Sequence, residues 1–234
     1  MQLSKLENLA YEELKKSGLV VFRIKDLVLL LKLHKTKVYN LIKALKRKEA
    51  IRKVGKGFFA LPGADEFVVA TNIHYPSYIS FWTALNYYDL TDNLPKKIFL
   101  VTTKYTQPIG NFKYVTLSQK RFFGYTSMGD SAVAEREKAI IDSLLFPKYS
   151  GGVKEVMKCV AAGKGELSVK KLIHYAERVE SKVVLRRLGF ILQHSGFKGY
   201  DTLKRNRGRG YVLLDPNLKR KNNFNKEWLL DINI

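Results

Sequence analysis

Four polar residues between positions 36 and 47 recur at a spacing that places them on one side of a helix. Thr36, Asn40, Lys43 and Arg47 fall in a single sector when successive residues turn by about 100°. Their hydroxyl, amide, ammonium and guanidinium groups donate hydrogen bonds to base edges or to phosphate oxygens. No carboxylate shares this sector, so nothing on it repels a phosphate backbone. The residue types therefore favour contact with nucleic acid.

Further cations and one aromatic ring accompany these residues. Lys37 and Tyr39 flank the sector, and Lys56 lies between two glycines that can take the positive φ of a tight turn. We expect Thr36, Asn40 and Lys43 to read bases and the others to hold phosphates. The predicted DNA-contacting residues are Lys35, Thr36, Lys37, Tyr39, Asn40, Lys43, Arg47, Arg52, Lys53 and Lys56. An ordinary solvated helix or a protein-docking module is the alternative interpretation.

Three helical patterns and a hairpin must position this face. Apolar residues repeat at helical spacing within 3–14, 24–31 and 38–45, and the third pattern extends over about 35–48. Two short strand-like runs, 50–54 and 58–61, flank the Gly55-Lys56-Gly57 turn. Three helices followed by a basic hairpin are typical of a winged helix-turn-helix. In that fold the third helix enters the major groove and the hairpin touches an adjacent phosphate strand.

The overall charge agrees with a polyanionic partner. The 234 residues include 42 Lys and Arg against 21 Asp and Glu, a net charge of +21, and residues 1–60 alone hold 15 basic and 5 acidic residues. Such an excess attracts nucleic acid or an acidic membrane surface. No apolar stretch approaches the roughly 20 residues that span a bilayer, so we expect no membrane association. The single cysteine, Cys159, excludes an intrachain disulfide, and we expect a cytoplasmic location.

A second domain follows the chain breakers Pro62 and Gly63. Helical patterns are predicted over 80–88, 134–145, 153–162, 168–179 and 182–196, and strands over 97–103, 112–117 and 211–214. Strands that precede a run of helices indicate an α+β fold. We therefore predict a winged helix-turn-helix over residues 1–63 and a larger α+β domain over residues 64–234.

One dense group of charges raises the question of catalysis. Asp130, Glu135, Glu137, Lys138 and Asp142 could in principle hold Mg²⁺ for a nuclease. However, nuclease motifs prefer a lysine that is one residue removed from the acid and on a strand, whereas Lys138 directly follows Glu137 on a helix. A solvated helix face with pairs at i, i+3 and i+4 explains the group better. The histidines lack metal-ligand spacing. The sequence thus predicts no catalytic residue, no metal and no cofactor.

A basic loop near the C-terminus has two interpretations. Residues 204–209 include Lys204, Arg205, Arg207 and Arg209, interspersed with glycine. Such a loop can follow a phosphate backbone as a second nucleic-acid contact, or it can be a mobile, solvated turn. The sequence leaves both open.

Several segments of the second domain resemble a known family. They are YPSYISFWTALNYY at 75–88, IFLVTTK at 98–104, FFGY at 122–125, AEREKAIID at 134–142 and RLG at 187–189. Together with the preceding winged-helix pattern, they resemble the AbiEi-type antitoxins of abortive-infection toxin–antitoxin systems. The resemblance implies that the winged helix binds repeats in its own promoter and represses the operon. It also implies that the larger domain opposes a nucleotidyltransferase-like toxin without forming a stable complex.

These observations predict a sequence-specific repressor that binds double-stranded DNA and acts as an antitoxin. Three alternatives remain open: a winged-helix regulator outside any toxin system, an RNA-binding module, and a Mg²⁺-dependent nuclease. The operator, the toxin partner and the oligomeric state do not follow from the sequence.

Overall fold

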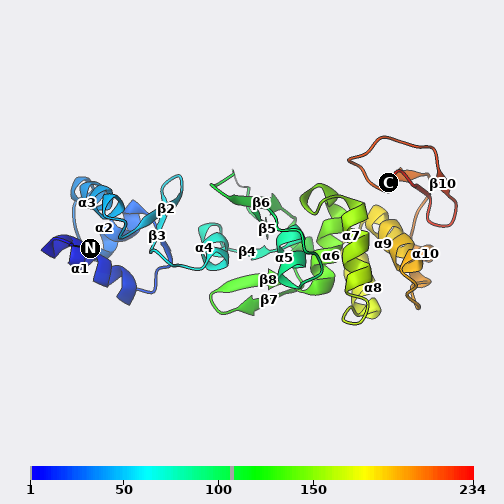
Figure 1. Cartoon of the computed structure of the whole chain (residues 1–234), viewed down its shortest axis with the longest axis horizontal. Coiled ribbons are helices and arrows are strands. Elements are labelled where there is room, and N and C mark those ends of the chain that lie inside the picture. The colour runs from blue at the N-terminus through cyan, green and yellow to red at the C-terminus, as the bar shows by residue number, and fades with distance from the viewer. Residues whose placement is uncertain (1, 106–107) are drawn as a thin grey trace.

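The computed structural model describes residues 2–105 and 108–234, and its fold is mixed α+β, as predicted. Figure 1 shows the chain progressing along the long axis of the molecule. The N-terminal helices lie at one end, a larger sheet lies in the middle, and the C-terminal segment lies at the opposite end. Among the described residues, no helix combines the length and apolar character that crossing a membrane requires.

The N-terminal part contains three helices and a small sheet. Its elements are α1 (Lys5–Lys16), β1 (Val21–Phe22), α2 (Ile24–Leu31), α3 (Lys35–Arg47), β2 (Arg52–Gly55) and β3 (Phe58–Ala60). The sheet is antiparallel with the order β1-β3-β2. Helix α1 begins with a capping box, in which the Ser4 hydroxyl accepts the Glu7 N–H and the Glu7 carboxylate accepts the Ser4 N–H. The predicted helices and strands of this part therefore form close to their predicted limits.

A five-stranded mixed sheet forms the middle of the molecule. Its strands are β4 (Ser77–Ile79), β5 (Ile98–Thr102), β6 (Phe112–Thr116), β7 (Tyr125–Met128) and β8 (Ser131–Ala134), in the order β6-β5-β4-β8-β7. Strand β5 pairs parallel with β6, and β4 pairs parallel with β8. Helices α4 (Glu66–Ile73) and α5 (Phe81–Tyr87) and the short turns η1 (Gln119–Arg121) and η2 (Pro147–Tyr149) complete this region. Phe122 and Phe123 of the FFGY segment lie in the connection that leads into β7, and Tyr125 of the same segment begins that strand.

Helices and a small sheet form the C-terminal part. They are α6 (Arg136–Leu145), α7 (Val153–Ala162), α8 (Val169–Arg178), α9 (Lys182–His194), α10 (Thr202–Arg205), β9 (Val212–Leu213), β10 (Phe224–Asn225) and β11 (Leu230–Asp231). The last three form a sheet of order β10-β11-β9. Trp228 is completely buried beside Gly189 of α9, and it fastens this sheet to the helices.

Two clusters of buried apolar side chains hold the molecule together. The smaller packs α1, α2 and α3 around residues such as Leu14, Leu27 and Leu45. The larger fills the rest of the chain, and it also takes in Val54 and Phe58 from the β2–β3 hairpin. The hairpin therefore lies between the two clusters, with one side packed against the middle sheet.

The interpretation of the charged group at 130–142 as a solvated helix face is wrong for three of its residues. Lys138 and Asp142 are completely buried, and Glu137 is nearly so. The reason is that α6 packs against α5, α7, α8 and α9, so it has little solvent-facing side. Asp142 accepts hydrogen bonds from Tyr78 and Ser80 and pairs with Lys138.

Candidate nucleic-acid interface

The outer side of α3 is exposed along its whole length. Thr36, Asn40, Lys43 and Arg47 are exposed, whereas the apolar residues on the opposite side of the helix are buried. Within the part of the chain that the structure describes, no carboxylate lies within 4.0 Å of the Lys43 or Arg47 cation. The face that the sequence analysis singled out is therefore both accessible and positively charged.

The residues that flank this face are exposed as well. Lys35 and Lys37 lie in the first turn of α3, and the ring of Tyr39 is 48% exposed. The Lys43 ammonium lies 4.7 Å from the centre of the Tyr39 ring, a cation–π distance. This contact holds a hydrogen-bonding phenol beside a cation on the surface.

An ion pair fixes α3 against α1. The Lys48 ammonium lies 2.6 Å from the Glu7 carboxylate. This hydrogen bond from Lys48, together with that from the Ser4 backbone N–H, lowers the pKa of Glu7 below its ordinary value. The Glu7 carboxylate is thus neutralised by Lys48, a cation outside the predicted face. Glu49 lies beyond the helix end, in a left-handed conformation with φ of 57°.

The hairpin presents two predicted cations. Lys53 and Lys56 are exposed, and Lys56 is at the tip, next to Gly57 with its φ of 78°. Between them, Val54 points inward to the larger apolar cluster. A Cβ on Gly55 would stand 2.2 Å from Cγ2 of Ile109, so Ile109 packs closely against the hairpin. The hairpin is therefore backed by the second part of the chain.

Arg52 is placed differently from the other predicted cations. Its side chain is only 34% exposed, and its guanidinium lies 2.7 Å from the Glu66 carboxylate. It also donates a hydrogen bond to the Ala64 carbonyl. Arg52 thus ties the hairpin to the start of α4, and this structural role competes with the predicted contact to phosphate.

A hollow joins the first turn of α3 to the hairpin tip. Its lining includes Lys35 and Gly57 together with Arg23, Lys25 and Leu29 from the region of α2. Arg23 stacks on the Phe58 ring at 4.0 Å, and Leu29 is 75% exposed. Arg23 and Lys25 are not among the predicted DNA-contacting residues. Their place beside Lys35 could have been anticipated only from the packing of α2 on α3.

Glu135 and Glu137, two acids of the charged group at 130–142, bind other side chains and backbone groups of the protein. Glu135 pairs with Lys171 at 2.6 Å and accepts the Tyr175 hydroxyl, and Glu137 accepts the Ser168 N–H. Across the described ranges, no three His, Cys, Asp or Glu side chains gather as a metal site would require. Burial raises the pKa of the Cys159 thiol to about 12, which disfavours the nucleophilic thiolate.

Comparison with known proteins adds one likeness in fold. No family model matches the chain, and no curated protein matches it. The chain is similar in structure to the RV2827C protein from Mycobacterium tuberculosis, known from a crystal structure, with a TM-score of 0.68 and 12% sequence identity. The match covers 98% of this chain and 92% of that chain. At this identity the likeness concerns the arrangement of helices and strands over nearly the whole chain, and nothing more.

Proposed function

We propose that this chain is a sequence-specific repressor that binds double-stranded DNA through an N-terminal winged helix-turn-helix. In this proposal α3 is the recognition helix and the β2–β3 hairpin is the wing. The carboxylate-free, exposed face of α3 carries the argument. An α-helix with its side chains is about 10–12 Å in diameter, which suits a major groove about 12 Å wide, and the thirteen residues of α3 extend over roughly 20 Å.

The proposed roles follow the position of each side chain. Thr36, Asn40 and Lys43 would contact base edges, with Asn40 suited to the paired donor and acceptor of adenine. Arg47 and Lys37 would hold phosphates at the edges of the groove. Lys53 and Lys56 would hold phosphates of the adjacent strand. Lys35 of α3 and Gly57 of the hairpin line the same hollow, which supports contact of both elements with one duplex.

Selection from a randomised duplex library tests this proposal. The full-length protein should enrich one sequence motif, and the Asn40→Ala variant should enrich a motif that is degenerate at one or two positions. The Glu13→Gln variant is a matched control on α1, away from the α3 face. Equal recovery of all duplex sequences by the unaltered protein would refute sequence-specific recognition.

We further propose that the repressor is the antitoxin of a toxin–antitoxin operon. This second part is supported by the resemblance of the middle and C-terminal segments to AbiEi-type antitoxins, and it requires an adjacent gene for a nucleotidyltransferase-like toxin. Expression of that toxin alone should arrest growth, and co-expression of this chain should restore it. Size-exclusion chromatography of the two proteins should show no stable complex. Failure to restore growth would refute the antitoxin role and leave the DNA-binding role standing.

A further inference from the structure

The C-terminal end of the molecule carries a second concentration of cations. Residues 198–226 include nine Lys and Arg against two acidic residues, and one of these, Asp215, is buried. In Figure 1 this segment lies at the end of the long axis opposite α3. A duplex docked on α3 therefore leaves these cations unused.

A buried arginine binds the backbone of the basic loop at 204–209. Arg186 of α9 is 3% exposed, and its guanidinium donates to the carbonyls of Arg207, Arg209 and Gly210 at 2.5, 2.9 and 2.7 Å. Gly208, with φ of 77°, passes so close to Lys182 that a Cβ there would meet its Cδ at 2.7 Å. The backbone carbonyls of residues 207, 209 and 210 are therefore held against α9 by hydrogen bonds.

Several cations of this end lack an acidic partner, whereas their neighbours are paired. Lys204 pairs with Asp201 and Glu227, and Arg220 lies 3.7 Å from Asp231. In residues 2–105 and 108–234, no carboxylate lies within 4.0 Å of five other cations at this end of the molecule. These are Arg205, Arg207, Arg209, Lys219 and Lys226.

Two exposed aromatic rings lie between Arg209 and Lys226 in the sequence. Tyr211 and Phe224 are 41% and 46% exposed, and their ring centres are 4.7 Å apart. Tyr211 directly precedes β9 and follows Arg209 by two residues, and Phe224 opens the edge strand β10 and precedes Lys226 by two. Exposed rings beside unpaired cations match the two needs of a single strand, which are stacking of unpaired bases and neutralisation of phosphates.

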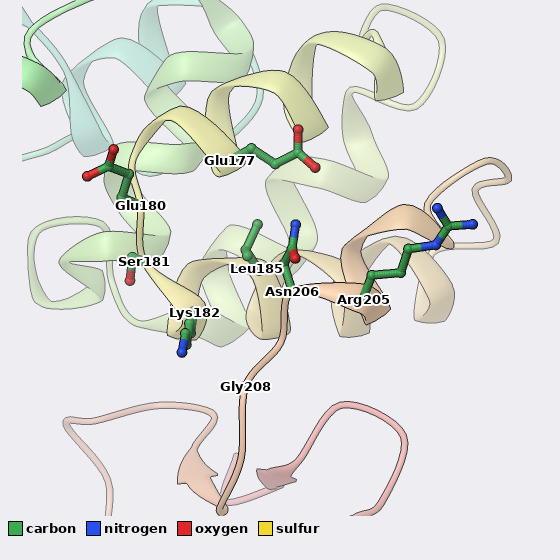
Figure 2. A pocket seen from close by; sticks show the side chains of 8 residues that line it. All are labelled: Glu177, Glu180, Ser181, Lys182, Leu185, Arg205, Asn206 and Gly208. Atoms are coloured by element: carbon green, nitrogen blue, oxygen red, sulfur yellow. The ribbon is translucent and has the colours of Figure 1, made fainter.

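The hollow on the other side of the loop is a different environment. Figure 2 shows that the carboxylates of Glu177 and Glu180 line it together with Lys182 and Arg205, and these acids disfavour a polyanion there. The same view shows the chain leaving this hollow at Gly208 toward the strands of the last sheet. The acid-poor surface is thus the one around Tyr211 and Phe224.

We propose that the C-terminal end binds single-stranded nucleic acid. Unpaired bases stack on Tyr211 and Phe224, and the cations two residues away from these rings in the chain, Arg209 and Lys226, contact the phosphates. A duplex fits this site less well because its base faces are covered by the neighbouring pairs. The site is independent of the proposed operator contact, since its residues and those of α3 lie at opposite ends of the molecule.

Fluorescence anisotropy with the full-length protein tests the site. To remove most of the contribution of α3, we would carry out the measurements in a Lys43→Ala background that also carries Lys37→Ala and Arg47→Ala. The probes are labelled oligo(U), labelled oligo(dT) and a duplex of equal length. At least one single-stranded probe should bind more tightly than the duplex. The double variant Tyr211→Ala with Phe224→Ala should weaken that binding by at least about tenfold and leave its salt dependence unchanged.

A charge variant gives a different signature. The double variant Arg209→Gln with Lys226→Gln should reduce the slope of log K against log salt by about 1.4, since each single-strand phosphate contact contributes roughly 0.7. Lys204→Gln is the matched control, because its partners are Asp201 and Glu227, and it should leave the slope unchanged. Phe224→Tyr should keep the affinity, because a phenol stacks as a phenyl ring does.

Three results would overturn the proposal. The first is an affinity for single strands that does not change when both rings are removed, in a variant whose circular dichroism and melting temperature match the parent. The second is loss of single-strand binding in the background with Lys37→Ala, Lys43→Ala and Arg47→Ala itself, which would assign that binding to α3. The third is stronger binding to vesicles that contain anionic lipid than to either oligonucleotide, which would assign the surface to a membrane.

Discussion

Lys138 and Asp142 form an ion pair one helical turn apart on α6, and solvent reaches neither side chain. The Lys138 ammonium also donates to the Tyr78 hydroxyl, and that hydroxyl and Ser80 both donate to Asp142. Burial, and then the neighbouring carboxylate, raise the pKa of Tyr78 well above its ordinary value, so the phenol stays neutral and keeps its proton for Asp142. The network joins β4 and the start of α5 to α6.

Removal of one member of this pair should be costly. Asp142→Ala leaves the Lys138 cation buried without a counter-charge, and we expect a loss of about 3–5 kcal/mol in the free energy of unfolding. Adding Lys138→Met to that variant should recover a large part of the loss, because no unpaired charge then remains. Urea denaturation of both variants measures the difference. A single variant within about 1 kcal/mol of the parent would contradict the burial of the pair.

The N-terminal elements could be predicted nearly to their limits, and the burial of Lys138 could not, for one physical reason. The apolar spacing of Val38, Leu41, Ile42 and Leu45 is local, and it alone decides which side of α3 is buried. Whether the polar side of α6 meets solvent depends instead on four helices from distant segments. No spacing within 134–145 contains that information.

The same distinction explains the candidate sites. The α3 face follows from one helix, so the sequence could indicate it in full. Arg52 was assigned to phosphate because its partner Glu66 lies beyond the hairpin and the chain breakers. Tyr211 and Phe224 are thirteen positions apart, and only the pairing of β9 and β10 with β11 brings their rings together. Strands of two residues, such as these, are too short to show a period.

Gly189 should tolerate no side chain. A Cβ at this position would stand 2.1 Å from the Trp228 ring, so Gly189→Ala must displace the ring or the helix, at an expected cost of about 1–3 kcal/mol. Thermal denaturation would register the loss, and in a Trp82→Phe background the fluorescence of Trp228 should shift to the red as the ring becomes exposed. Gly165→Ala is the matched control, because nothing lies within 4 Å of the added methyl group. Equal melting temperatures for the two variants would contradict the contact.

His74 should make stability depend on pH. Its ring lies between Phe58 of the hairpin and Tyr114 of β6, with centroid distances of 6.2 and 4.8 Å. Burial, then the charges of Arg23 and Lys104, lower the pKa of His74 below its ordinary value of 6.5. Near pH 6.5 the unfolded chain therefore takes up the proton first. Stability should fall as the pH decreases through that value and stop falling below the pKa of the folded state.

Urea denaturation between about pH 7.5 and about pH 5.5 measures this effect, a window above the ordinary carboxyl pKa of 4.5. His74→Phe keeps an aromatic ring and should flatten the curve in this window. His174→Gln, at an exposed position, is the control and should retain the dependence. A His74→Phe variant that follows the parent curve would contradict the assignment.

Asn40 should contribute to base discrimination. If its amide contacts a base edge, Asn40→Ala should reduce the preference for the selected operator over a single-base variant by about 1–3 kcal/mol. Affinity for unrelated duplex DNA should hardly change, because the substitution removes no charge. Competition binding at constant salt measures both quantities. Unchanged discrimination at every operator position would remove Asn40 from the base-reading set and require a different orientation of α3 in the groove.

Lys56 and Arg52 belong to the same hairpin but should have different roles. We expect Lys56 to contact a phosphate and Arg52 to stabilise the fold. Lys56 is exposed at the tip and has no carboxylate within 4.0 Å in the described part of the chain, so Lys56→Ala should weaken binding to all duplexes alike. The slope of log K against log salt should fall by about 0.9, the contribution of one phosphate contact. Arg52→Ala breaks the pair with Glu66, and it should lower the melting temperature with a smaller change in slope. Titrations at several salt concentrations, together with thermal denaturation, distinguish the two. A slope that is unchanged by Lys56→Ala and reduced by Arg52→Ala would reverse these roles, because the guanidinium would then have to leave Glu66 for the phosphate when DNA binds.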